Sequence, residues 1–173
     1  MNRTEKAASE TMGAAKAAKA TIENLSGVFK ELMREHGEVT ALLMRLKMSS
    51  DLGLRRQLFP TIREALLAHE KGELAVVYPA FREHADLVGY ADAHESEATT
   101  LEHKIRRLSA MPYDDGHWAI AFTDLVNAVS NHVKEEEGEY FPKASRVLGR
   151  EASESMEAPY EAKKREIISE MRR

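Results

Sequence analysis

Two short segments of the chain pair a histidine with a glutamate four residues later. One runs from His69 to Glu73 and the other from His132 to Glu136, and in both a proline follows the histidine by ten residues. On an α-helix, residues four apart leave the same face one turn apart, so the imidazole and the carboxylate can reach one site. Nitrogen and oxygen donors at this spacing favour a metal centre.

Each of these segments follows a stretch with one histidine on its own apolar stripe. His36 precedes His69, and His94 precedes His132, so the chain repeats one plan. Burying four imidazoles and two carboxylates among aliphatic side chains is costly unless something satisfies them. Donors of this kind, converging from four helices, suit a pair of iron or manganese ions better than calcium, which prefers oxygen alone.

Four amphipathic helices are needed to position these side chains. Apolar residues at three- and four-residue steps predict a helix over about 22–49, a second up to Tyr78-Pro79, a third ending before Met111-Pro112, and a fourth reaching Phe141-Pro142. Short connections with turn residues imply antiparallel neighbours around one core. The prediction is an all-α, up-down four-helix bundle.

The predicted organisation has three parts: an N-terminal arm over 1–21, a metal-binding bundle over 22–146, and a C-terminal helical tail over 147–173. The 173 residues include no cysteine, which excludes disulfides, thiolate metal sites and Fe–S ligands. The net charge of -4 does not favour nucleic acid or an anionic membrane as partner. Without a signal-like or membrane-spanning segment, a cytoplasmic location is expected.

The order of these residues resembles the bacterial hemerythrin and HHE cation-binding family. The resemblance covers about residues 22–146 and includes the flanking Tyr78-Pro79 and Phe141-Pro142. It implies a hemerythrin-like bundle with two iron ions bridged by an oxo or hydroxo group and by two carboxylates. The implied ligands are His36 and His69 on one ion, His94 and His132 on the other, and Glu73 and Glu136 between them. Glu137 stays open as the alternative to Glu136.

The resemblance also implies a function, with one departure. It implies binding or sensing of dioxygen or a related small molecule, and no catalytic residue beyond the metal ligands. Members commonly carry a further histidine one turn after His94, where this chain has Ala98. A methyl group cannot coordinate, so water, hydroxide or an unexpected side chain should take that position. This open position favours the alternative function, an enzyme that handles peroxide or nitric oxide. The sequence does not identify a protein partner.

Three other hypotheses fit the sequence less well. A ferritin-like di-iron oxidase needs Glu-x-x-His on two helices, whereas here histidine comes first. The iron–sulfur repair branch of the family carries an added cysteine-bearing segment, which this chain lacks. A metal-free bundle leaves the paired His and Glu unsatisfied.

Several remaining polar residues are assigned to the surface. Glu70, Glu95 and Glu135 are expected to be solvated or to support the ligands. His84 and His117 are expected at helix ends. His103, nine residues after His94, is expected to face away from the site.

Overall fold

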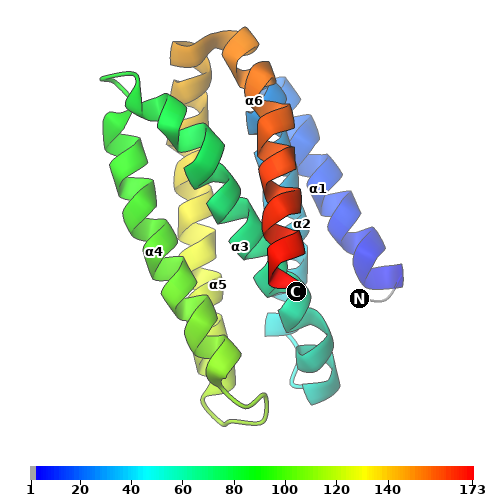
Figure 1. The fold of residues 1–173 in the computed structure, drawn as a ribbon. Helices are drawn as coiled ribbons and strands as arrows, with labels where there is room; N and C mark the ends of the chain where they lie inside the picture. Colours follow the sequence, from blue (N-terminus) through cyan, green and yellow to red (C-terminus); the bar gives the residue numbers. More distant parts are fainter. Residues whose placement is uncertain (1–2) are drawn as a thin grey trace.

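The computed structural model describes residues 3–173, which form six α-helices and one π-helical turn (Figure 1). The elements are α1 (Arg3–Ile22), α2 (Gly27–Lys47), α3 (Leu52–Arg82), α4 (Val88–Ala110), α5 (Trp118–Glu135), η1 (Glu136–Tyr140) and α6 (Phe141–Met171). The expected all-α class is confirmed for these residues. None of the helices within this range has the length and apolarity needed to cross a membrane.

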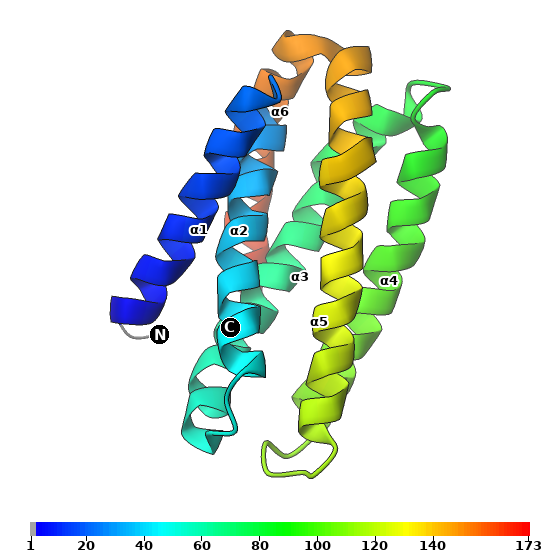
Figure 2. The ribbon, with the colours of Figure 1, turned by 180° about the vertical axis from the view of Figure 1, so that it is seen from behind.

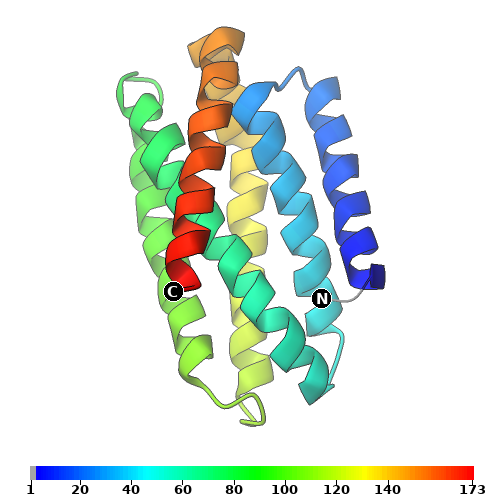
Figure 3. The ribbon, with the colours of Figure 1, turned by 45° about the vertical axis from the view of Figure 1, so that its right-hand side comes forward.

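Helices α2, α3, α4 and α5 lie side by side, and consecutive helices are joined at alternate ends (Figures 1 and 2). Contacts run from α2 to α3, α3 to α4, α4 to α5 and α5 back to α2, so the four helices enclose one interior. Helix α1 packs along the outside of α2, and α6 packs on α2 and α3 (Figure 3). The two flanking helices therefore cover the side of the bundle formed by α2 and α3.

Local sequence signals account for the start of α3 and for the course of the chain at two prolines. The Asp51 carboxylate accepts a hydrogen bond of 2.7 Å from the Gly53 N–H and so caps the start of α3. Helix α3 continues three residues past Pro79, beyond the expected end, because a proline disturbs the turn before it and not the residues after it. The chain also stays helical through Pro142, which occupies the first turn of α6, where no N–H is needed.

Helix α6 contains a sharp change of direction. Gly149 has φ 81° and ψ 171°, outside the helical region. A positive φ carries little penalty only for glycine, so this residue lets the chain turn back along the bundle. Residues 150–171 thereby return over α2 and α3 and bring Tyr160 and Lys164 against the interior.

The interior consists of two apolar clusters separated by a polar layer. One cluster holds Leu42, Phe59, Leu101 and Trp118 among others, and the second holds Phe29, Phe81, Phe141 and Tyr160 among others. On α2, α3 and α4, the expected metal ligands fall between the residues of the first cluster and those of the second. His132 of α5 lies beside Val133, the last residue of the first cluster, and Glu136 lies between Val133 and Tyr140 of the second. The fold thus places one polar layer across the middle of an otherwise apolar core.

Candidate metal centre

All six side chains expected as ligands lie in this polar layer, and Glu70 joins them. The seven residues are at most 7% exposed: His36, His69, Glu70, Glu73, His94, His132 and Glu136. Their donor atoms form two groups able to hold an ion each. The first group contains His36, His69 and Glu136, and the second contains Glu70, Glu73, His94 and His132.

The first group brings α2, α3 and the π-helical turn together. The Nε2 atoms of His36 and His69 lie 3.2 Å apart. The Glu136 Oε2 atom lies 3.2 Å from Nε2 of His36. Three donor atoms from three elements therefore point at one small volume.

The second group joins α3, α4 and α5. The Nε2 atom of His94 lies 3.1 Å from Oε2 of Glu73. The Nε2 atom of His132 lies 3.3 Å from Oε1 of Glu70. This group carries two carboxylates, whereas the first carries one.

Two carboxylates connect the groups. Glu73 Oε2 lies 3.3 Å from His69 of the first group and 3.1 Å from His94 of the second. Glu136 Oε2 lies 3.2 Å from His36 of the first group and 3.3 Å from His132 of the second. Each carboxylate is thus within reach of a histidine on either side, which is the arrangement that a shared ligand of two ions requires.

Three of the four histidines are oriented by a further carboxylate. The Nδ1 atoms of His36, His69 and His132 lie 3.0, 2.9 and 2.9 Å from carboxylate oxygens of Glu137, Glu35 and Glu97, respectively. Such hydrogen bonds fix the ring orientation and leave Nε2 free to bind a metal. Glu136 and Glu137 therefore occupy different places, the first inside the layer and the second behind the His36 ring. The Nδ1 atom of His94 has no hydrogen-bond partner.

The π-helical turn explains how two consecutive glutamates are both buried. It spans Glu136–Tyr140, and the Phe141 N–H donates to the carbonyl of Glu136, five residues back. Helices take this wider form mostly in single turns at functional sites. Here the turn begins at a residue of the polar layer and directs both Glu136 and Glu137 toward histidines.

Side chains from the flanking helices and from α3 complete the surroundings. The Tyr78 hydroxyl donates a hydrogen bond of 2.5 Å to Glu136. The Tyr160 hydroxyl donates one of 2.7 Å to Glu35. Lys164 of α6 is ion-paired with Glu35, and Lys16 of α1 is ion-paired with Glu137.

The electrostatics of the polar layer favour the binding of positive charge. Burial raises the pKa of Glu73 well above its usual value, and the nearby charges of Glu136 and Glu70 raise it further. Burial opposes the charged form of His132, yet Glu136 and Glu70 together raise its pKa well above the usual value. The crowded carboxylates thus favour binding a cation or a proton.

Unpartnered atoms in the layer fit metal ions. Glu70 Oε2, Glu73 Oε1, Glu136 Oε2 and His132 Nε2 are buried without a hydrogen-bond partner. Buried polar atoms without partners are rare and costly, and metal coordination would satisfy these four. The donor set of imidazoles and carboxylates matches the preferences of iron, manganese or zinc.

The other polar residues are placed mostly as expected. Glu95, Glu135, His103 and His117 are exposed, and His84 is half-buried. Glu70 is the exception, because it is 5% exposed and lies among the donor atoms of the second group. Of the two places expected for Glu70, the solvated one is wrong, since the α3 face next to His69 is covered by α4 and α5.

Sequence reasoning missed Glu70 as a candidate ligand, and it missed Glu35 and Glu97 as parts of the site. A weak signal was available for the first two, since each adjoins a ligand histidine in the sequence: Glu35-His36 and His69-Glu70. Glu97 follows His94 by three residues, which places both side chains on one face of α4. No comparable signal marks Tyr160, because α6 reaches the site only through tertiary packing.

Residues 27–144 match the hemerythrin HHE cation-binding domain. The chain belongs to this family. Among curated proteins, the HHE chain is similar to a DNA nickase from Nostoc sp. (strain PCC 7120), at 25% identity over 135 residues. That match covers 77% of this chain and 38% of the relative, so the HHE chain spans well under half of the relative's length. No solved structure gives a significant match.

Proposed function

We propose that this HHE protein is a non-haem di-iron protein that binds or senses dioxygen or a related small molecule. The observation that carries the proposal is the pair of carboxylates, Glu73 and Glu136, each within 3.3 Å of histidines from both donor groups. The proposal takes α2–α5 as the antiparallel four-helix bundle of the family and places an ion in each group. Bound iron would supply one-electron redox chemistry and a Lewis-acid position for a small ligand.

The two positions differ in the protein donors that they offer. Glu70 supports the second ion, where its Oε2 atom is unpartnered and lies 3.9 Å from Nε2 of His94. It would serve as the unexpected side chain in place of the histidine that Ala98 replaces. The first group has three donor residues and the second has four, so exogenous ligands should bind on the His36 and His69 side.

Metal analysis and visible spectroscopy test the proposal. Protein from iron-replete cells should contain about two iron ions per chain, and Glu136→Ala should lower both the iron content and the visible absorption. Glu139→Ala is the matched control, because Glu139 is exposed three residues away. One zinc and no iron per chain, or full iron content in Glu136→Ala, would reject the proposal.

The same preparation separates binding from turnover. A spectral change on exposure to oxygen, without oxygen consumption, supports binding or sensing. Catalytic loss of peroxide or nitric oxide, abolished in Glu136→Ala, supports the enzyme alternative. That alternative is favoured by the small number of protein donors in the first group.

The Nostoc relative is named a DNA nickase, and this name motivates one additional assay. The net charge of -4 on this chain does not favour binding a polyanion. We therefore expect the iron-loaded protein to leave supercoiled plasmid intact. Nicking by the wild-type protein but not by Glu136→Ala would replace the proposed function with DNA cleavage at the metal centre.

A further inference from the structure

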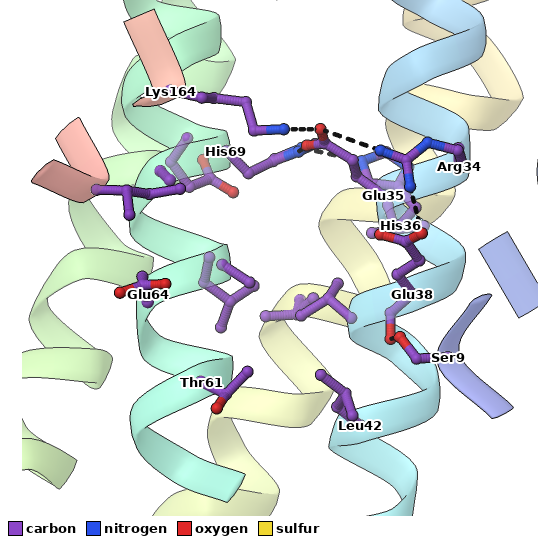
Figure 4. Close-up of a pocket in the computed structure, with 18 of the residues that line it drawn as sticks. Ser9, Arg34, Glu35, His36, Glu38, Leu42, Thr61, Glu64, His69 and Lys164 are labelled. Atoms are coloured by element: carbon purple, nitrogen blue, oxygen red, sulfur yellow. Dashed lines mark hydrogen bonds and ion pairs between the residues drawn. The ribbon is translucent and has the colours of Figure 1, made fainter. Parts of the chain in front are cut away.

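A cavity of about 260 Å³ opens beside the polar layer (Figure 4). It lies between α2 and α3, with α5 behind it. Its lining includes His36, His69, Glu70 and His132, so a molecule in the cavity would lie beside residues of both donor groups. The cavity is thus continuous with the candidate metal centre.

Most of the surface exposed inside the cavity is apolar, although polar and charged side chains also line it. Its aliphatic part includes Val39 and Leu42 from α2, Leu66 from α3, and Val129 and Val133 from α5. Such walls favour an apolar occupant, because transferring apolar surface out of water stabilises the complex.

The charged side chains at the mouth are already paired within the protein. Arg34 is paired with Glu31 and Glu38, and Lys164 is paired with Glu35 and Glu161. Glu64 accepts a hydrogen bond of 2.6 Å from Arg172. At the mouth, a charged ligand would have to compete with these pairs, which is costly. Closer to the polar layer, it would have to compete with the second proposed ion for Glu70 and His132.

The size of the cavity exceeds what a diatomic molecule needs. A water molecule takes about 30 Å³ in the liquid, and an apolar cavity of about 150 Å³ in another protein holds benzene. The space beside the donor groups is larger than that cavity. An occupant with one or two small rings therefore matches the volume.

Part of the lining comes from helices outside the HHE match. The family match covers residues 27–144, whereas Ser9 belongs to α1, and Lys164 and Ile168 belong to α6. The outer part of the cavity is therefore built by segments that this chain adds to the family domain. Its occupant is expected to be particular to this chain.

From these observations we propose that the cavity binds a small, uncharged, apolar organic molecule of about the size of benzene to indole. The role of that molecule as a substrate or effector of the metal centre rests on the proposed function. The binding itself does not rest on the proposed function, because the aliphatic part of the lining is present without metal.

Fluorine NMR with fluorobenzene as the probe tests the proposal on the full-length protein. The protein as purified should broaden the fluorobenzene signal, and titration gives the dissociation constant. Leu42→Trp, which fills the cavity with an indole ring, should weaken binding at least tenfold. Ile120→Trp is the matched control, since Ile120 is 68% exposed on α5 and should leave binding unchanged.

Thr61→Trp provides a second variant in case Leu42→Trp does not fold. Thr61 lines the cavity two helical turns before His69 and is only partly buried, so a large side chain there should block the mouth. Loss of binding in either variant supports the proposal. Absence of binding to the wild-type chain, or wild-type affinity in both folded variants, overturns it.

The iron content of the same samples distinguishes this proposal from the proposed function. Wild-type protein with two iron ions but no fluorobenzene binding would reject the cavity proposal alone. Protein without iron that still binds fluorobenzene in a Leu42-dependent way would reject the di-iron function and leave the cavity proposal standing.

Discussion

Ala98 and Glu70 face each other across a small gap beside the second donor group. Both line a cavity of about 50 Å³ between α3 and α4. Ala98 is buried, so an imidazole at that position would point into the space next to Glu70. The short alanine side chain therefore leaves room beside the Glu70 carboxylate, which lies where the histidine of other family members is expected.

Glu70→Gln should remove about one of the two proposed iron ions per chain. The amide keeps the shape of the side chain but loses the negative charge that the ion near His94 and His132 requires. Iron content measured after gel filtration checks this. Glu95→Gln is the control, because Glu95 is exposed on α4. Two irons in Glu70→Gln would show that Glu70 is not a ligand.

Among single residues of the site, the sequence predicts those that follow a ligand histidine by one helical turn. The four-residue step fixes Glu73 relative to His69 and Glu136 relative to His132, because the step alone places both side chains on one face. Glu70 escapes prediction because an adjacent residue is turned about 100° around a helix. Whether that direction meets solvent or another helix depends on how α4 and α5 pack.

Helices α1 and α6 act on the site through matching chains of contacts. Lys16 of α1 is paired with Glu137, which contacts Nδ1 of His36. Lys164 of α6 is paired with Glu35, which contacts Nδ1 of His69. Both histidines belong to the group with three donors, so the two flanking helices support the same proposed ion.

In Lys164→Met, a chelator should remove the ion proposed at His36 and His69 about ten times faster. Changes in the groups that orient a ligand histidine weaken metal binding about 10- to 100-fold. Stopped-flow absorption with a ferrous chelator measures the rate. Lys163→Met is the matched control, because Lys163 pairs only with Glu166 at the surface. Equal rates in both variants would mean that α6 does not orient His69.

The contact between α1 and α2 depends on two glycines. A Cβ atom on Gly37 would lie 2.7 Å from the carbonyl carbon of Met12 and 2.8 Å from the Cα atom of Gly13. Backbone atoms cannot move aside as a flexible side chain can, so any larger residue at position 37 must push the two helices apart. This close approach brings Lys16 within reach of Glu137.

Gly37→Ala should lower the free energy of unfolding by about 1–3 kcal/mol, the range for inserting a group into a packed interface. Urea denaturation followed by circular dichroism measures the change. Gly89→Ala serves as control, because a Cβ there meets no atom within 4 Å and alanine favours helix. An unchanged midpoint for Gly37→Ala would contradict the packing of α1 on α2.

Helix positions along the chain were largely predictable, whereas two backbone irregularities were not. Hydrophobic periodicity gives the apolar stripes of α2 to α5, since those faces pack against one core. The π-helical turn at Glu136 and the change of direction at Gly149 leave no mark on that periodicity. Both follow from tertiary demands: the first from burial of two glutamates, the second from the return of α6 over the bundle.

The molecule as a whole joins two apolar clusters through a layer of buried charge. Without a bound cation, the layer holds crowded carboxylates and unpartnered atoms, which destabilise the fold. With ions bound, the same groups become ligands, and the binding free energy adds to the stability of the folded state. The core is therefore expected to be stable mainly in its metal-bound form.

Removal of the proposed iron ions by a chelator should lower the melting temperature by roughly 8–16 °C. Free metal at a thousand times its dissociation constant stabilises the folded state by about 4 kcal/mol, and each kcal/mol shifts the melting temperature of a chain of this size by about 2–4 °C. Differential scanning calorimetry with and without chelator gives the shift. Equal melting temperatures would show that no ion contributes to the stability of the layer.

Glu73→Leu separates the metal effect from ordinary packing. Leucine removes a carboxylate whose pKa is raised by burial and by the charges of Glu136 and Glu70, so the metal-free variant should melt at or above the temperature of the metal-free wild type. The same change removes a proposed shared ligand, so iron should no longer raise its melting temperature. A metal-free Glu73→Leu protein that melts well below metal-free wild type would instead assign Glu73 a structural role, because the layer would then depend on that carboxylate even without a cation.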